Sequence, residues 1–107
     1  MLVELDLFSG RPNPRWELTG GAADALRGLL GRLAVAHDEP PEPPGLGYRG
    51  FILMEDTYRS RAYKGYVIRA DVVLADPSFS VEHILLERLP HQFQELRRCV
   101  ARELAEE

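Results

Sequence analysis

The chain has 107 residues, of which 45% are apolar and 28% are charged, and its formal net charge is −4. This composition is close to the globular average, and the length predicts one α+β domain spanning residues 1–107. The net charge argues against general phosphate-backbone binding, and a single cysteine, Cys99, excludes internal disulfides and multi-cysteine metal sites. Acidic residues near the start and the lack of about 20 consecutive apolar residues predict a cytoplasmic protein without a membrane span.

The first predicted element is a half-buried strand over Leu2–Phe8. Apolar residues alternate along it, so that Val3, Leu5 and Leu7 point one way and Leu2, Glu4, Asp6 and Phe8 the other. The strand runs into the segment Ser9–Trp16, where Pro12 and Pro14 cannot donate to a sheet ladder. We therefore expect the chain to turn there.

A helix is expected from Ala22 to about Ala36, with Thr19 as its N-cap. Leucines recur at the spacing of one helical face, at positions Leu26, Leu29, Leu30 and Leu33. The proline-rich stretch that follows, residues 39–47, has little that could anchor it in a core. We interpret it as a connecting loop stiffened toward polyproline II and not as a domain boundary.

Two further strands are predicted, over Gly50–Asp56 and Tyr66–Leu74, joined by a polar connection over Thr57–Lys64. The inner face of the second of these strands would be formed by Tyr66, Ile68, Ala70, Val72 and Leu74. Their proximity in the sequence favours an antiparallel hairpin.

Asp76-Pro77 should end the hairpin, and Ser80 should cap a helix that begins at Val81. Pro90 is expected to kink this helix or to open a new one, and an apolar stripe continues to the end of the chain through Leu89, Phe93, Leu96, Val100 and Leu104. The order β-α-β-β-α-α predicts a small antiparallel sheet of about three strands, covered on one face by helices and similar to a ferredoxin-like fold lacking its last strand. So small a sheet would favour pairing in a homodimer.

The loop after the first strand is the main candidate site. Two prolines restrain its backbone, and arginine and tryptophan are the residues most enriched in binding hot spots. The candidate binding residues are Arg11, Asn13, Arg15 and Trp16 from this loop, with Tyr48 and Arg49. The competing interpretation is structural: Trp16 covers the edge of the core, Asn13 stabilises a turn, and the arginines pair with acidic residues such as Asp6 or Glu17.

Other constellations remain open as alternatives. His83, Glu87 and His91 would share one helical face and could hold a metal, although Pro90 interrupts that face. Aromatic and basic residues are interleaved between Tyr48 and Arg69 in the manner of single-strand nucleic-acid binders, but acidic residues lie among them. Cys99 reads as a half-buried structural cysteine.

No enzyme motif occurs, and no cofactor is indicated. The sequence therefore favours a non-enzymatic accessory protein that recognises a protein or peptide partner through a sheet edge and the arginine-tryptophan loop. The alternative is a small enzyme or small-molecule-binding protein. Its polar pocket would lie between sheet and helices and draw on Arg15, Tyr48, Arg49, Glu55, Asp56 and Tyr58.

Overall fold

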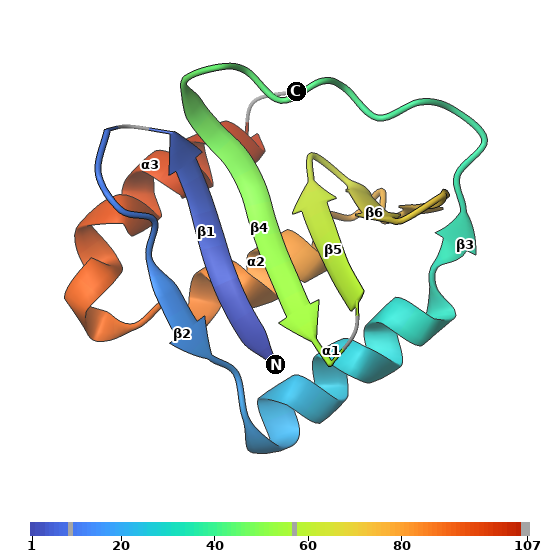
Figure 1. Cartoon of the computed structure of the whole chain (residues 1–107), viewed down its shortest axis with the longest axis horizontal. Helices are drawn as coiled ribbons and strands as arrows, with labels where there is room; N and C mark the ends of the chain where they lie inside the picture. Colours follow the sequence, from blue (N-terminus) through green and yellow to red (C-terminus); the bar gives the residue numbers. More distant parts are fainter. Residues whose placement is uncertain (9, 57, 106–107) are drawn as a thin grey trace.

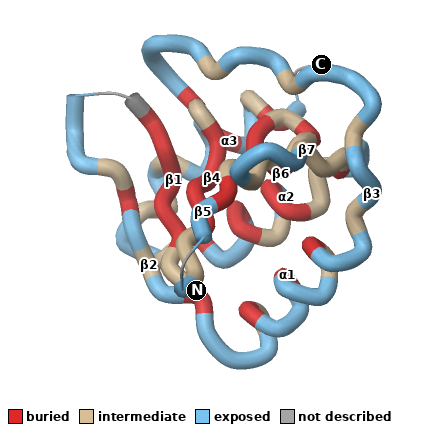
Figure 2. The backbone as a smooth tube through the Cα atoms, turned by 45° about the vertical axis from the view of Figure 1, so that its right-hand side comes forward, coloured by how far each residue is buried: buried red, intermediate tan, exposed pale blue. Residues whose placement is uncertain are grey.

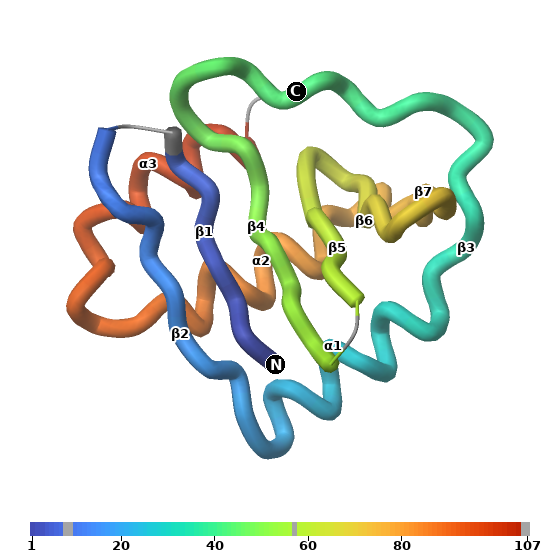
Figure 3. Tube along the Cα trace, viewed as in Figure 1, coloured from blue at the N-terminus to red at the C-terminus, as the bar shows by residue number. Residues whose placement is uncertain are grey.

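The computed structural model describes residues 1–8, 10–56 and 58–105, and within them one seven-stranded antiparallel sheet. The strands are β1 (Leu2–Phe8), β2 (Arg15–Glu17), β3 (Ala34–Val35), β4 (Gly47–Glu55), β5 (Tyr58–Tyr63), β6 (Tyr66–Arg69) and β7 (Val72–Ala75). The helices are α1 (Gly20–Arg32), α2 (Ser80–Glu87) and α3 (Gln94–Ala105), with a short 3-10 turn, η1 (His91–Phe93), before α3. The spatial order of the strands is β2-β1-β4-β5-β6-β7-β3 (Figure 1 and Figure 3).

The expected three-stranded sheet with a ferredoxin-like topology is therefore wrong. Most of the predicted polar connection after β4 is strand β5, in which Arg59 and Arg61 alternate with the buried Ser60 and Ala62. Charged residues on one face hid this period-two pattern. Thr57, which that connection included, lies outside the described residues.

The predicted strand over Tyr66–Leu74 is also two strands, β6 and β7. They are separated by a tight turn in which Ala70 adopts a φ of 49°. The predicted inner face was wrong as well, because Val67 is the fully buried residue of β6 while Tyr66 and Ile68 remain partly exposed. Four consecutive strands, β4 to β7, thus form a meander.

The helices agree better with the sequence pattern. Thr19 precedes α1 as predicted, although its side chain makes no capping bond, and Leu26 and Leu30 are buried. The helix ends earlier than expected because Ala34 and Val35 leave it to pair with β7. The connection between β3 and β4 then passes along one end of the sheet without entering the core (Figure 3).

Pro90 separates α2 from η1 and α3, so the predicted interruption is confirmed. The apolar stripe that follows also behaves as expected, since Leu89, Val100 and Leu104 are buried. Neither helix could continue through Pro90, which lacks the backbone N–H that a helical turn requires.

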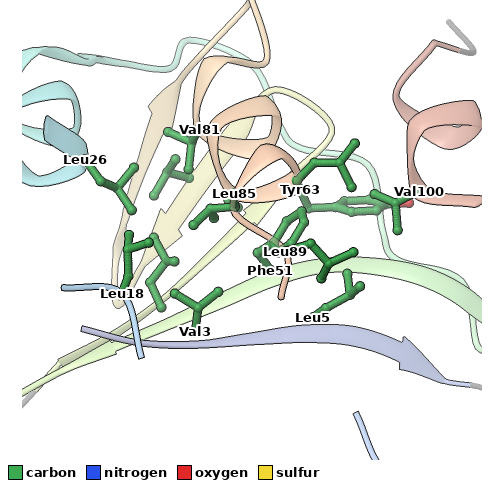
Figure 4. Close-up of a cluster of buried hydrophobic side chains, with 14 of the residues drawn as sticks. Val3, Leu5, Leu18, Leu26, Phe51, Tyr63, Val81, Leu85, Leu89 and Val100 are labelled. Carbon is green, nitrogen blue, oxygen red and sulfur yellow. The ribbon is translucent and has the colours of Figure 1, made fainter. Parts of the chain in front are cut away.

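The core lies between one face of the sheet and the helices. α2 and α3 pass behind β1 and β4 in Figure 1, and α1 flanks one end of the sheet and contacts α2. Val3 and Leu5 of β1 point toward Leu85 of α2, with Phe51 of β4 beside them (Figure 4). The buried residues follow this interior surface, whereas the outer side of α1 is exposed (Figure 2).

Among the described residues, none of the helices combines the length and the apolar character that crossing a bilayer would require.

Candidate functional site

β1 is buried on both of its sides, but only one side faces the helices. Val3, Leu5 and Leu7 enter the core, as the alternation predicts, while Glu4 and Asp6 point to the opposite side. No helix of the described chain covers that side of β1, β4 and β5 (Figure 1). Glu4 and Asp6 are nevertheless only 7% and 8% exposed. Two carboxylates buried on an open sheet face require partners, because desolvated charge is costly unless it is paired.

Glu4 is paired by two residues that come from the loop after β1. The Arg15 Nε atom lies 2.7 Å from one carboxylate oxygen of Glu4, and the Asn13 side-chain amide donates to the other at 2.8 Å. The carbonyl oxygen of the Asn13 side chain accepts the backbone N–H of Leu7 at 3.0 Å. Asn13 therefore fastens the loop to β1 with both ends of its amide and helps to fix Arg15.

Asp6 is paired by arginines from the next two strands. Arg61 of β5 donates to its Oδ2 atom at 2.9 Å, and Arg49 of β4 approaches the same oxygen at 3.4 Å. The Asn13 amide reaches Oδ1 of Asp6 at 3.3 Å. Arg61 also donates to the backbone carbonyl of Arg49, so Arg61 is tied to β4 as well as to Asp6.

A β-bulge at Gly50 decides which residues of β4 reach this side. Leu5 pairs with Phe51 but Leu7 pairs with Tyr48, so β4 carries one extra residue between them. Gly50 has a φ of +98°, and a Cβ atom there would lie 2.4 Å from the carbonyl oxygen of Ala62. Only glycine fits this position. The bulge reverses the alternation, which sends Tyr48 into the core and turns Arg49 toward Asp6.

We call the resulting surface the arginine face: Arg15, Arg49, Arg59 and Arg61, with Glu4, Asp6 and Asn13 as their supports. Arg59 belongs to it because it lies two residues from Arg61 on the same side of β5. Four arginines against two carboxylates make this surface locally cationic in a chain whose net charge is −4.

The guanidinium groups of Arg15, Arg49 and Arg61 are held by protein partners but still have nitrogens that can donate to a ligand. The side chains of Arg15, Arg49 and Arg61 are 62%, 29% and 26% exposed. Within the described residues, each of these three arginines keeps at least one terminal guanidinium nitrogen without a protein partner. Each can therefore donate to a carboxylate or phosphate oxygen outside the protein while its other nitrogens hold it in place.

Apolar side chains of the sheet lie between the arginines. Ile52 lies in register between Glu4 and Arg61 and is only 3% exposed, although it is not part of the core cluster. Ile52, Arg59, Ser60, Arg61 and Ile68 line a hollow of about 200 Å³. The face can therefore receive an apolar group as well as an anion.

The residues predicted as a site are divided between the two sides of the sheet. Asn13, Arg15 and Arg49 meet on the arginine face. Trp16 faces the core and packs edge-on against Phe51 with ring centroids 6.3 Å apart, as the structural interpretation of that loop held. Ser9, the first residue of the loop, lies outside the described residues.

Tyr48 is part of the core and of a buried polar network. Its hydroxyl donates to Glu82 of α2, which is 1% exposed and also accepts the backbone N–H of Gly65 at 2.9 Å. Burial, together with the carboxylate of Glu82, raises the pKa of Tyr48 far above its usual value. Tyr48 therefore fixes α2 to the sheet and does not face solvent.

Arg11 is exposed and lies apart from the arginine face. It borders a cavity of about 150 Å³ between the proline loop and the start of α3, together with Leu7, Phe93 and Leu96. Most of this lining is apolar.

The alternative polar pocket does not form from the six residues proposed for it. Arg15 and Arg49 lie on the arginine face, Tyr48 is in the core, and Asp56 is exposed. Glu55 and Tyr58 instead border a cavity of about 170 Å³ between α1 and the sheet. Its other lining residues are Met1, Arg27, Leu30, Gly31, Leu53, Ser60 and Arg69.

The polar side chains of this cavity are largely paired with one another. The Nε atom of Arg27 lies 2.8 Å from Glu55, and its hydrogen bonds lower the pKa of that carboxyl. Arg69 donates to the Ser60 hydroxyl at 3.0 Å and lies over the ring of Tyr58, 4.7 Å from its centroid.

The remaining constellations separate in three dimensions. α2 ends at Glu87, so His91 does not continue the face that carries His83. Across the described residues, no group of three or more potential metal ligands comes together. Cys99 is exposed, so the prediction of a half-buried cysteine was wrong.

The interleaved aromatic and basic residues between Tyr48 and Arg69 also lie on opposite sides of the sheet. The rings of Tyr48, Phe51 and Tyr63 are buried in the core, whereas Arg49, Arg59 and Arg61 are on the opposite side of the sheet. A stacking platform with alternating aromatic and basic side chains is therefore not formed by these residues.

Glu4 and Arg61, which help to organise the site, were not among the predicted binding residues, and Asp6 was predicted only as an acidic partner of the loop arginines. The available signal was two carboxylates on the outward positions of an otherwise apolar strand, and arginines at alternate positions of Tyr58–Tyr63.

No protein-family model matches this chain, no curated protein is significantly similar to its sequence, and no solved structure is significantly similar to its fold.

Proposed function

We propose that this chain is a non-enzymatic recognition module that binds an acidic protein or peptide segment on the arginine face. The observation that carries the proposal is the pairing of Arg15, Arg49 and Arg61 with two buried carboxylates on a sheet face without helices. Because the guanidinium groups are already held in place, little side-chain entropy is lost when an acidic partner binds.

The hollow lined by Ile52 and Ile68 predicts that the partner carries an apolar side chain as well as acidic residues. A partner with an apolar side chain between acidic residues would place that side chain in this hollow, beside the partly exposed Ile68, while its carboxylates meet the surrounding arginines. Bidentate contacts between arginine and carboxylate add geometric specificity. We therefore expect an extended segment in which acidic residues flank a leucine or valine.

Binding of matched synthetic peptides tests this proposal. One labelled peptide carries a leucine flanked by glutamates, and the second replaces every glutamate by lysine; fluorescence anisotropy measures both at two salt concentrations. We expect the acidic peptide alone to bind, and its affinity to fall as salt rises.

Single arginine substitutions test whether the acidic peptide binds on the arginine face. Arg59→Ala removes an exposed arginine that has no hydrogen bond or ion pair in the described structure, so the fold should remain intact. Arg61→Ala removes an anchored arginine. We expect each to weaken binding about three- to tenfold, or about 0.7–1.4 kcal/mol. Arg97→Ala, an exposed arginine on α3, is the matched control and should have no effect. Equal binding of both peptides, or equal loss with the control, would refute the proposal.

A second candidate function is binding of a small carboxylate in the cavity under α1. It is favoured by Arg69, whose guanidinium is fixed by Ser60 and Tyr58 above the apolar residues Leu30 and Leu53. The volume of about 170 Å³ is below the usual ligand range of about 300–1,000 Å³, so only a ligand of a few heavy atoms fits.

Saturation-transfer NMR with acetate, propionate and butyrate would test this second candidate. Binding that is lost in Arg69→Gln and kept in Arg61→Ala supports it, and no transfer to any of the three acids refutes it.

We also propose that the protein is cytoplasmic. Cys99 is an exposed free thiol, which suits a reducing compartment better than an oxidising one.

A further inference from the structure

β2 is an edge strand, and its hydrogen bonds show which backbone groups are free. The Leu5 N–H bonds to the Pro14 carbonyl at 3.0 Å, and the Leu18 N–H bonds to the Met1 carbonyl at 2.8 Å. Alternate residues of an antiparallel strand direct their backbone groups to opposite sides. Pro14, Trp16 and Leu18 therefore bond toward β1, while Arg15 and Glu17 present their N–H and C=O groups to the open edge.

The side chains at this edge are complementary to a second copy of themselves. If two β2 strands pair antiparallel about Trp16, Arg15 of each copy lies opposite Glu17 of the other. Both residues project to the side of the sheet that carries Glu4, because Arg15 pairs with Glu4 and Glu17 with Leu2. Opposite charges directly across two strands stabilise their pairing, and this register provides two such pairs.

The backbone supports the same register. Arg15 and Glu17 would form hydrogen-bonded pairs across the edge, each exchanging two backbone bonds. The two Trp16 residues would form the closer, non-hydrogen-bonded pair on the core side. Trp16 is only partly buried, and its indole N–H is the one buried side-chain polar atom of the described residues without a hydrogen-bond partner.

We propose that the chain associates with a second copy through antiparallel pairing of their β2 edges, with Trp16 at the twofold axis. The pairing joins two seven-stranded sheets and brings the two arginine faces side by side. An extended acidic ligand could then contact both. The inference goes beyond the proposed function and does not depend on it.

The edge is short, so the association should be concentration-dependent. β2 has three residues, and Pro12 and Pro14 limit its extension toward the preceding loop. Pairing over so few residues buries less surface than the roughly 1,200–2,000 Å² of a stable interface. We expect a dimer that is populated at high protein concentration and dissociates on dilution.

Sedimentation equilibrium of two charge variants, alone and mixed, tests the register. Glu17→Arg alone places arginine opposite arginine, and Arg15→Glu alone places glutamate opposite glutamate, so each should be monomeric. In the mixture both cross-strand pairs are complementary, and a heterodimer should form. Glu17 also pairs with the Met1 ammonium at 2.9 Å and Arg15 with Glu4, so thermal unfolding of each variant is measured in parallel.

A second test does not depend on Arg15→Glu and removes a backbone hydrogen-bond donor from the open edge of β2. Glu17→Pro removes an N–H group that faces the open edge and no internal hydrogen bond, so it should reduce dimerisation at least tenfold relative to Glu17→Ala. Arg61→Ala should leave the dimer unchanged while it weakens peptide binding. Wild-type protein that stays monomeric up to about 1 mM, or a dimer unaffected by Glu17→Pro and Glu17→Arg, would overturn the inference.

Discussion

The two sides of β1 are both buried, by different means. Val3, Leu5 and Leu7 on the helix side are 0–7% exposed, and Glu4 and Asp6 on the other side are 7% and 8% exposed. Helices exclude water from the first side, whereas the second is shielded by the long side chains of its own arginines. Low exposure alone therefore does not distinguish a core from a binding surface.

The difference lies in what each side would lose if a partner were removed. On the helix side most contacts are apolar, and the buried hydrogen bonds there, such as that between Tyr48 and Glu82, are also internal to the fold. On the arginine face the arginines satisfy Glu4 and Asp6 with part of their nitrogens and keep the rest for solvent. We expect substitutions on the first side to cost stability, and substitutions on the second to cost binding more than stability.

The largest expected effect is on the helix side. Leu5→Ala removes a fully buried side chain from the centre of the core and should lower the free energy of unfolding by about 2–5 kcal/mol. Chemical denaturation measures this loss. A loss below about 1 kcal/mol would mean that the core is not closed by the helices as described.

The next effect concerns the bulge that separates the two sides. Gly50→Ala forces a Cβ atom against the Ala62 carbonyl at a φ of +98°, and the strain should cost about 1–3 kcal/mol. Because the bulge also aims Arg49 at Asp6, peptide binding should fall in the same variant. Gly28→Ala on the exposed side of α1 is the control, and it should not reduce stability or binding comparably.

Tyr48→Phe tests a buried polar network on the helix side. It leaves Glu82 with a single hydrogen bond from Gly65, and we expect a loss of about 1–3 kcal/mol at pH 7. The pKa of Tyr48 is raised in the folded protein by burial and by Glu82, so the protonated phenol is favoured in the fold.

The stability that this raised pKa provides is fully present below the unfolded pKa of about 10 and is lost as pH rises above it. Wild-type protein should therefore lose stability between about pH 9 and 11 more steeply than Tyr48→Phe. Parallel slopes in denaturation at these pH values would contradict the buried network.

The smallest expected effect on stability is that of Arg15→Ala. Its side chain is 62% exposed and itself shields Glu4, so its removal admits water to Glu4, which keeps its bond from Asn13; ion pairs at such positions contribute at most about 1 kcal/mol. The same variant should weaken the acidic peptide several-fold. If stability falls as much as in Leu5→Ala while binding is unchanged, Arg15 serves the fold and not a ligand.

The parts of the fold that the sequence predicts are those with strong periodicity. The strand over Leu2–Phe8, the faces of its side chains and the break at Pro90 follow from alternation and proline chemistry. β2 and β3 are too short to show a period. The turn at Ala70 lacks the glycine or asparagine that usually marks a positive φ.

The candidate site was predictable only in part. Asn13, Arg15 and Arg49 belong to the predicted set, and Arg15 pairs with an acidic residue as the structural interpretation expected. Tyr48 was misplaced because the predicted strand begins at Gly50, whereas β4 begins at Gly47. A one-residue bulge in β4, which simple alternation does not reveal, turns Tyr48 into the core. The role of Glu4 and Asp6 emerges only when the strands are placed side by side.

The most direct test of the central claim is an NMR titration of the ¹⁵N-labelled protein with the glutamate-leucine peptide. We predict that shift changes concentrate on β1, β2, β4 and β5 and on the Nε signals of Arg15, Arg49 and Arg61, and that added salt reverses them. Changes centred on α1 or α3, or no change at all, would contradict the assignment of the arginine face as a binding surface.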